Sequence, residues 1–497
     1  MMRKFFTFIT VLGLCSSQSY AQINVLTFEN ILNQGFENNY NIKLQELTLE
    51  QADYTLLKAR GGLNAFVNTD LTYGSGVNPS LDNDGTQILQ TEFVVPTRLG
   101  IDFYSGARVE RTIEFGDPNT PFNASGAFAG IKIPLLRDLG RASLLNTDIL
   151  VSETSKKAFN EELSNEILTY FTRLLINYLS LKESIEAFKI SKDILEESEK
   201  YRDQIDELIK NDQIPRSELS RANSLYIQNL QQLNMSEMQA TQVFFDTKTL
   251  IGVDNFVKSD TLPILTDSFP DPEKEEIFTF VEESLPNVDT LIKNTPQYKS
   301  IEFRVYEEEL LVENARNQKL NPLDLDIRIS TFGSSENGAF NLNNTFNSLP
   351  GTSFLITLTH NLPIRNQQRR GAYLEQLTEF DISKTNLNQF FYESSVNTKL
   401  NLELLKQKIE IFEESLKLAE LMKKNYEDEL AKYKLGTATQ TDIIIVLEDY
   451  FDALKSVNTL KYDVWKSYVQ IKFQLGDLPK NEEELNSFML LGLFYRI

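Results

Sequence analysis

Few residues of this chain have side chains suited to making and breaking bonds. His360 is the only histidine and Cys15 the only cysteine among 497 residues. A zinc site needs several His or Cys ligands, and a Ser-His-Asp triad needs a histidine base beside its nucleophile. The 71 acidic residues offer carboxylate pairs, but no nucleophile–base pair, Gly-rich phosphate loop or sign of a cleft accompanies them. We therefore predict no enzyme activity, no metal site and no cofactor.

The N-terminus predicts export from the cytoplasm. Two basic residues precede a short apolar run at 5–14, and Ser19-Tyr20-Ala21 has the small-x-small pattern of a signal-peptidase site. We assign 1–21 to a signal peptide, which removes Cys15 with it. A lipidated cysteine is the alternative, but Leu14 stands where a lipoprotein signal has a small residue.

Charge and hydropathy exclude further classes. Without the two basic signal residues the chain has 47 basic against 71 acidic residues, a net charge of −24. This balance argues against binding nucleic acid, whose phosphates require a basic surface. No apolar run after the signal approaches the roughly 20 residues of a membrane-spanning helix. Residence in a membrane would therefore require a β-barrel.

The chain repeats its own plan. Ser217-Glu218-Leu219 matches Thr441-Asp442-Ile443, and Ile251-Gly252 matches Leu475-Gly476, both at an offset of 224. We predict a first repeat at 22–252, a linker at 253–287, a second repeat at 288–476 and a C-terminal tail at 477–497. The predicted helices lie at about 27–60, 138–210, 215–251, 288–318, 366–434 and 438–475, and the strands near 64–73, 126–134, 321–332 and 352–362. Tip turns near 211–215 and 435–438 reverse the two long helices.

Apolar and polar residues alternate along the predicted strands, and the predicted helices carry a stripe of apolar residues at heptad spacing. Leu323, Leu325 and Ile327 interleave with polar residues, as in a membrane barrel with a wet interior, although a soluble antiparallel sheet has the same period. A seven-residue apolar period, at 167–188 and 402–419, predicts helices packed as coiled coils. Helices of about 70 residues would be on the order of 100 Å long, and the two shorter helices of each repeat sum to the same length. These lengths favour a long cylinder.

Two stretches carry a resemblance to a known family. YKLGTATQTDII, starting at Tyr433, is similar to the pattern Y-x-x-G-x-x-[ST]-x-x-D-[VIL]-[LI], and IPLLRDLGR, at 133–141, resembles Q-P-L-L-R-x-x-G-R. Both patterns are typical of TolC-like outer-membrane efflux channels, and the duplicated plan extends the resemblance over nearly the whole mature chain.

The resemblance implies a homotrimer in the outer membrane. Each chain would give four strands to a shared 12-stranded β-barrel, continued by an α-helical coiled-coil barrel in the periplasm, with the linker and tail as an equatorial belt. The channel would be the passive exit duct of a tripartite efflux or type I secretion system, docked on a periplasmic adaptor and an inner-membrane transporter. The alternative is an exported coiled-coil scaffold or adaptor without a pore. The segment 75–125 holds extra strand-like pieces, which form either a long extracellular loop or a hairpin that extends the barrel.

The resemblance also implies residue roles at the two tips. Asp442 would form an acidic ring at the pore constriction; the alternative is a solvated acid in the first turn of a helix. Tyr433 and Glu218 would form a link that holds the tip closed, or else they are surface packing residues. Gly436 would make the second turn, and Asn211 and Asp212 the first, where no glycine is present. Ala438 and Ile445 replace a basic and an acidic residue found in the family, so this gate differs from its relatives.

Overall fold

The computed structural model of the chain divides into two compact units. The sheet unit comprises Leu44–Asn165 and Lys293–Glu393, and the helical unit comprises Met1–Lys43, Glu166–Ile292 and Ser394–Ile497. The residues that the structure describes are 25–78, 83–114, 122–211, 214–252, 262–265, 270–335 and 352–477. The predicted signal peptide, Asp212 and the tail beyond Asp477 lie outside the described residues.

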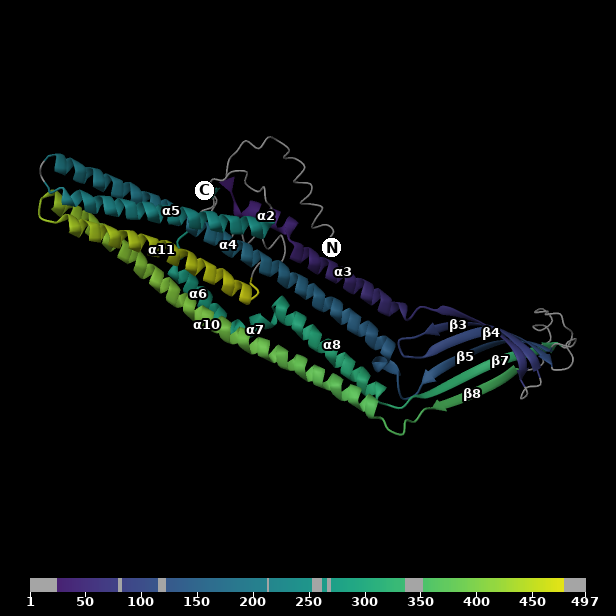
Figure 1. The fold of residues 1–497 in the computed structure, drawn as a ribbon. Helices are drawn as coiled ribbons and strands as arrows, with labels where there is room; N and C mark the ends of the chain where they lie inside the picture. The colour runs from purple at the N-terminus through teal and green to yellow at the C-terminus, as the bar shows by residue number, and fades with distance from the viewer. Residues whose placement is uncertain are drawn as a thin grey trace. The chain divides into compact units, whose positions relative to one another are not determined.

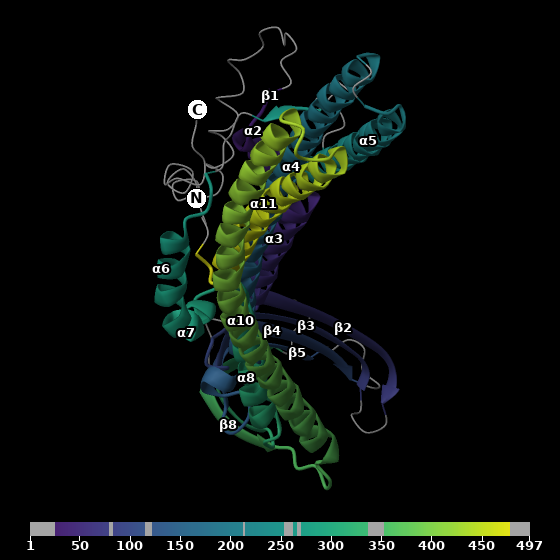
Figure 2. The ribbon, with the colours of Figure 1, turned by 90° about the vertical axis from the view of Figure 1, so that its left-hand side faces the viewer.

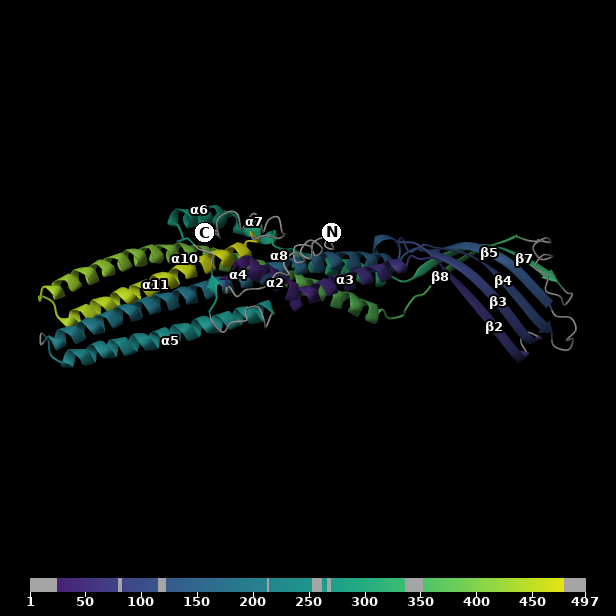
Figure 3. The ribbon, with the colours of Figure 1, turned by 90° about the horizontal axis from the view of Figure 1, so that it is seen from above.

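One antiparallel sheet of six strands is the main element of the sheet unit (Figure 1). The strands are β2 (Phe66–Asn78), β3 (Asn83–Pro96), β4 (Asp102–Glu114), β5 (Phe122–Pro134), β7 (Leu323–Ser335) and β8 (Thr352–His360). They are hydrogen-bonded in the order β2-β3-β4-β5-β7-β8. Figure 3 shows β2, β3, β4 and β5 side by side and curved along their length.

The expectation of four strands per chain is wrong, because the sheet has six. The four predicted strands correspond to β2, β5, β7 and β8, and the segment 75–125 contributes β3 and β4 between β2 and β5. β3 pairs with β2 from Phe66↔Val94 and with β4 as far as Pro96↔Asp102. Strands with ladder partners on both sides satisfy their backbone groups within the sheet. The extra hairpin is therefore an integral part of the sheet and not a loop.

The two faces of this sheet differ in chemistry, because side chains alternate along each strand. One face carries mainly apolar side chains: Val67, Leu71, Leu89, Phe93, Phe103, Ile131, Ile327, Ile329, Phe354, Ile356 and Leu358. The other carries mainly polar ones: Asn68, Asp70, Gln90, Glu92, Asp102, Arg108, Lys132, Asp324, Asp326, Arg328 and Thr357. Leu71 is 77 % exposed and Phe354 is 63 % exposed in the single chain. The apolar face is therefore not a core of this chain.

Glycines on the polar face make room for aromatic rings of the neighbouring strands. Gly106 lies opposite Phe128, and Gly126 lies opposite Phe332. A Cβ atom at either glycine would come within 2.6 Å of the opposing ring. A side chain at these positions would push the rings away, so glycine there reflects close packing across the strands.

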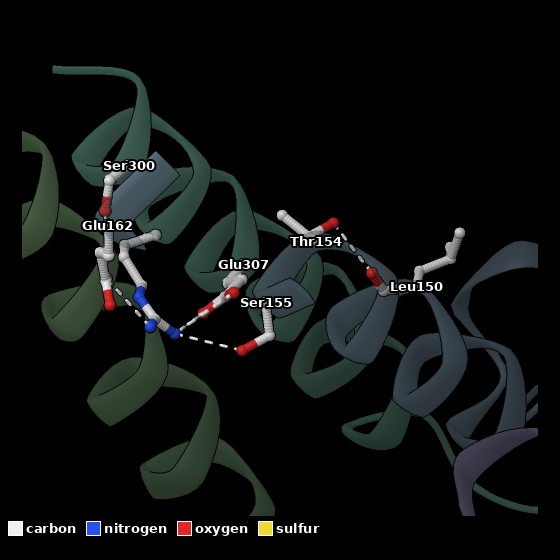
Figure 4. A network of polar contacts seen from close by, with 7 residues as sticks. Leu150, Thr154, Ser155, Glu162, Ser300 and Glu307 are labelled. Carbon is white, nitrogen blue, oxygen red and sulfur yellow. Dashed lines mark hydrogen bonds and ion pairs between the residues drawn. The ribbon is translucent and has the colours of Figure 1, made fainter. Parts of the chain in front are cut away.

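Helix α8 (Pro296–Gln318) packs on the part of α4 (Leu144–Lys210) that belongs to the sheet unit. Thr295 caps α8 by accepting a hydrogen bond from the Tyr298 N–H, and Pro296 occupies the first turn. A polar network joins the two helices, and Figure 4 shows Ser155, Glu162, Ser300 and Glu307 in it. Its centre is the Arg304 guanidinium.

The helical unit contains the long antiparallel helices. They are the remainder of α4, α5 (Ser217–Ile251), the second part of α10 (Gln367–Lys434), and α11 (Gln440–Gln474), with α2 (Phe28–Asn38) and α7 (Val288–Lys293) beside them. Figures 1 and 3 show α4, α5, α10 and α11 side by side. The predicted heptad seam is confirmed: Phe171, Leu174, Tyr178 and Leu181 are buried, as are Leu402, Leu405, Ile409 and Phe412.

The predicted linker at 253–287 contains an ordered helix, α6 (Lys274–Ser284), which lies alongside α10 and α11 (Figure 2). The Phe280 ring packs edge-on against Tyr468 at 4.8 Å between centroids, and Trp465 Nε1 donates a hydrogen bond to the Pro270 carbonyl at 3.1 Å. Helix α3 (Tyr40–Gly61) crosses the boundary between the units in sequence. In the described part of the chain, no helix has an apolar stretch of the length that crossing a bilayer requires.

Candidate functional site

The turn between α10 and α11 depends on Gly436. Its backbone has φ +75°, the left-handed region that favours glycine. The Gly436 N–H donates to the Tyr433 carbonyl at 2.9 Å and the Thr437 N–H donates to the Lys432 carbonyl at 3.0 Å, which closes the last turn of α10. A Cβ atom at Gly436 would meet nothing within 4 Å, so backbone conformation is the reason for glycine here.

Asp442 takes part in a capping box at the start of α11. The Asp442 N–H donates to Thr439 Oγ1 at 3.3 Å, and the Thr439 N–H donates to Asp442 Oδ2 at 2.9 Å. The Thr439 hydroxyl lies 2.6 Å from the same carboxylate oxygen. These bonds to Thr439 lower the pKa of the exposed Asp442 carboxyl, because they stabilise its charged form. In the single chain, Asp442 therefore has the role of a helix-capping acid.

The first turn is built differently. Helix α4 ends at Lys210, the Asn211 N–H donates to the Glu207 carbonyl at 3.2 Å, and α5 begins at Ser217. Among the described non-glycine residues only Asp138 has a positive φ. Asn211 therefore lies in the turn without adopting the left-handed backbone of Gly436.

The two turns lie next to each other at one end of the helical unit (Figures 1 and 3). A buried apolar cluster packs α4, α5 and α11 together behind them, and we call it the tip cluster. Its members are Ile194, Tyr201, Ile205, Ala222, Leu225, Ile443, Leu447 and Phe451. Tyr426, Leu430 and Tyr433 of α10 pack against it. The tip cluster fixes one helical hairpin against the other within a single chain.

Tyr433 and Glu218 lie in one neighbourhood beside this cluster. Burial raises the pKa of the half-buried Tyr433 phenol, and the nearby Glu218 charge raises it further. Glu218 also forms an ion pair with Arg221, with 3.5 Å between Oε2 and Nη1. The predicted link between Tyr433 and Glu218 stays a prediction, although the Glu218 charge acts on the Tyr433 phenol within one chain.

The hydrogen bond between Arg221 and Thr441 was not predicted from the sequence. Arg221 Nη1 donates to Thr441 Oγ1 at 3.0 Å, which joins the start of α5 to the first turn of α11. Arg221 lies three residues after Glu218, on the same face of α5, and this spacing was the only signal for it in the sequence. Among the described residues, no group of three or more His, Cys, Asp or Glu side chains is placed to hold a metal ion.

Comparisons with known proteins identify the fold. No family model and no curated protein matches the sequence. The CmeC outer membrane channel of Campylobacter jejuni is similar in structure, with a TM-score of 0.62 and 15 % identity over 94 % of this chain and 89 % of that one. The outer membrane protein VceC of Vibrio cholerae has a TM-score of 0.64 and 11 % identity over 90 % of this chain and 96 % of that one.

The MtrE outer membrane channel of Neisseria gonorrhoeae, solved in an open state, gives the same result. Its TM-score is 0.58 at 12 % identity, and the match covers 93 % of each chain. At such identities the likeness establishes the fold alone. It confirms the resemblance found in the sequence: the chain has the fold of the TolC-like outer-membrane channels.

Proposed function

We propose that the protein is an outer-membrane channel of an efflux or type I secretion system. The observation that carries this proposal is the exposed apolar face of the six-stranded sheet. A soluble sheet of this size would bury that face against a helix layer or a second sheet. Leu71, Phe354 and Leu358 are instead 77 %, 63 % and 61 % exposed. Lipid is the environment that suits an apolar face backed by a polar one.

The exported scaffold is the less favoured candidate. It accounts for the long helices and the acidic charge, but it leaves the apolar sheet face in water. Exposed apolar patches of this kind are otherwise sites of association or aggregation. The similarity in fold to outer membrane channels over at least 90 % of the chain also favours the channel.

In the proposed assembly three copies form one channel. The sheets make a barrel in the outer membrane, and the helices make a tunnel in the periplasm. The matched helix lengths support this plan: α4 and α10 have 67 and 68 residues, and α5 and α11 have 35 each. The tips dock on a periplasmic adaptor, and an inner-membrane transporter supplies the energy. The channel itself catalyses nothing and needs no cofactor.

Localisation and assembly test this proposal directly. Fractionated cells should hold the protein in the outer membrane, and it should run as an SDS-resistant trimer until it is boiled. A periplasmic monomer that stays in the soluble fraction would contradict the proposal.

The tips are the proposed periplasmic entrance, with Asp442 as a ring of three carboxylates. Asp442→Asn is the sharpest variant, since asparagine retains an oxygen that accepts the Thr439 N–H bond of the capping box while it removes the charge. In planar bilayers, the variant should lose cation selectivity and block by multivalent cations. Unchanged selectivity and block would leave Asp442 as a capping residue only.

The pair Tyr433–Glu218 and the hydrogen bond from Arg221 to Thr441 are the proposed latch of the closed tip. Tyr433→Phe with Arg221→Ala should raise the conductance of the closed channel, because both changes remove polar links and leave the tip cluster intact. Lys417→Ala, at an exposed position of α10 well before its end at Lys434, is the matched control. A double variant that conducts like the parent would show that packing alone closes the tip.

A further inference from the structure

We infer that the channel wall contains eighteen strands, six from each of three copies, with β2 of one copy paired to β8 of the next. This inference rests on the proposed function of a three-copy channel in a membrane. It differs from the 12-stranded barrel that the sequence resemblance implied. The difference arises from the β3–β4 hairpin.

The open edges of the sheet call for another copy of this chain. In the described chain β2 and β8 are the two ends of the strand order and do not pair with each other. Unpaired backbone groups on an edge strand cost several kcal/mol each in the lipid core, so an open sheet does not persist there. Val67 on β2 and Ile356 on β8 are 61 % and 57 % exposed. Each edge therefore needs a strand with the same alternation as its own.

The direction of the strands allows a ring of identical copies to close. Every neighbouring pair in the sheet is antiparallel. With six strands, β2 and β8 run in opposite directions, so β8 of one copy meets β2 of a rotated copy in the antiparallel sense. This is a heterologous contact that closes by rotation. The same strand geometry thus continues around the whole wall.

The β3–β4 hairpin continues both faces of the sheet, as a wall segment must. Gln90 lies opposite Asp70 on β2 and opposite Arg108 on β4, all on the polar face. Phe93 lies opposite Val67 on the apolar face. A surface loop would not be expected to align its apolar side chains with the apolar face of the neighbouring strand.

The extra strands widen the pore. For strands about 4.8 Å apart and tilted by about 40°, eighteen strands give a backbone-to-backbone diameter of about 36 Å, against about 24 Å for twelve. The area enclosed by the backbone is thus roughly doubled. The outer opening would admit bulkier solutes than a 12-stranded barrel does.

Cysteine labelling in the membrane tests whether the hairpin is part of the wall. Single-cysteine variants are made at Gln90 and Phe93 in β3, with Thr357 and Ile356 in β8 as the matched pair, and Cys15 replaced. Intact outer membranes are treated with a membrane-impermeant maleimide. We expect Gln90→Cys and Thr357→Cys to be labelled from the water-filled lumen. Phe93→Cys and Ile356→Cys should be protected by lipid and become labelled only after detergent is added.

The results separate this inference from the proposed function. If the two β8 sites differ in labelling as expected but both β3 sites are fully labelled, the hairpin lies outside the wall. This result would overturn the eighteen-strand inference and leave the proposed channel standing. Absence of alternation in both strands would overturn the membrane channel itself. A variant that fails to reach the outer membrane is replaced by one at Leu89 or Glu92, which keep the same two faces.

The number of copies provides the second measurement. Native mass spectrometry of the full chain in detergent should give three copies, and image averages of the particle should show eighteen strands. A two-copy particle, whose wall would have twelve strands, would overturn the strand count.

Discussion

Replacing Arg304 with methionine should loosen α8 from α4. Arg304 Nη1 donates to Ser155 Oγ at 3.2 Å and to Glu307 Oε2 at 3.2 Å, and Nη2 donates to Glu162 Oε1 at 3.2 Å. The guanidinium also lies 4.3 Å from the centre of the Phe159 ring. Methionine keeps an apolar stem against this ring and removes every polar contact.

The expected cost follows from these contacts. A hydrogen bond to a charged group contributes about 1.5–3 kcal/mol when both groups are shielded from water. The Arg304 side chain is one third exposed, so solvent screening reduces the contribution of each contact. The Glu307 side chain is only 12 % exposed and would lose its cationic partner. We expect a total loss of about 2–3 kcal/mol, dominated by the poorly solvated Glu307 carboxylate.

Amide hydrogen exchange of the assembled protein measures this effect where it occurs. Peptides covering Pro296–Gln318 should exchange about 30 to 150 times faster in Arg304→Met than in the parent, since each 1.4 kcal/mol is a factor of ten. Glu309→Gln is the matched control, because Glu309 is exposed on the same helix. Exchange in Arg304→Met within about twofold of the parent, the range of a surface substitution, would refute this reasoning. In a Glu307→Gln background, which removes the poorly solvated carboxylate, Arg304→Met should cost less stability than it does in the parent.

Three further predictions concern single positions. Burial raises the pKa of Glu307 above its unfolded value despite the opposing effect of the Arg304 charge, so its stabilising contribution is present at low pH and is lost as the pH rises. The stability of Glu307→Gln relative to the parent should therefore increase from about pH 4 to about pH 7. Amide exchange of both proteins at these two pH values measures the difference. Gly436→Ala should destabilise the second turn by about 1–2 kcal/mol because of its positive φ, whereas Gly371→Ala, inside α10 with open space around it, should stabilise by about 0.5–1 kcal/mol. Thr439→Ala should cost about 1 kcal/mol and speed exchange in the first turn of α11, and unchanged exchange there would contradict the capping role.

The long helices were predictable because their pattern is local and repeats many times. The seam residues Leu402, Leu405 and Ile409 recur at heptad spacing, and all three are buried. Strands β7 and β8 were found near their observed bounds for the same reason, since Leu323 to Ile329 alternate strictly. In these elements the sequence period alone determines which face is apolar.

The full sheet could not be predicted, because β3 and β4 have blurred alternation. Ile88 and Val94 lie on the polar face of β3, and Thr91 interrupts its apolar face. Ser105 and Ala107 give β4 small side chains where a clear period would need large apolar ones. Such strands are stabilised by neighbours on both sides, and those neighbours are set by tertiary pairing that the local sequence does not encode.

The tip shows the same division between local and tertiary information. Gly436 and the T-x-x-D spacing of Thr439 and Asp442 follow local rules, and a capping box could have been read from this spacing. The contact of Arg221 with Thr441 joins residues 220 positions apart, so it depends on how two hairpins pack. Periodicity gives no information on that packing.

The capping box changes what is expected of Asp442 in the proposed entrance. Three carboxylates brought together would raise one another's pKa, because like charges disfavour ionisation. The bonds to Thr439 act in the opposite direction and lower the pKa before any copies meet. Since these bonds are local, they persist in an assembly as long as α11 begins where it does. Thr439 would therefore have two effects at once: it starts the helix, and it helps to keep the ring of carboxylates charged at neutral pH. A ring of carboxylates at helix N-termini therefore stays ionised more readily than a ring of carboxylates without hydrogen-bond donors beside them.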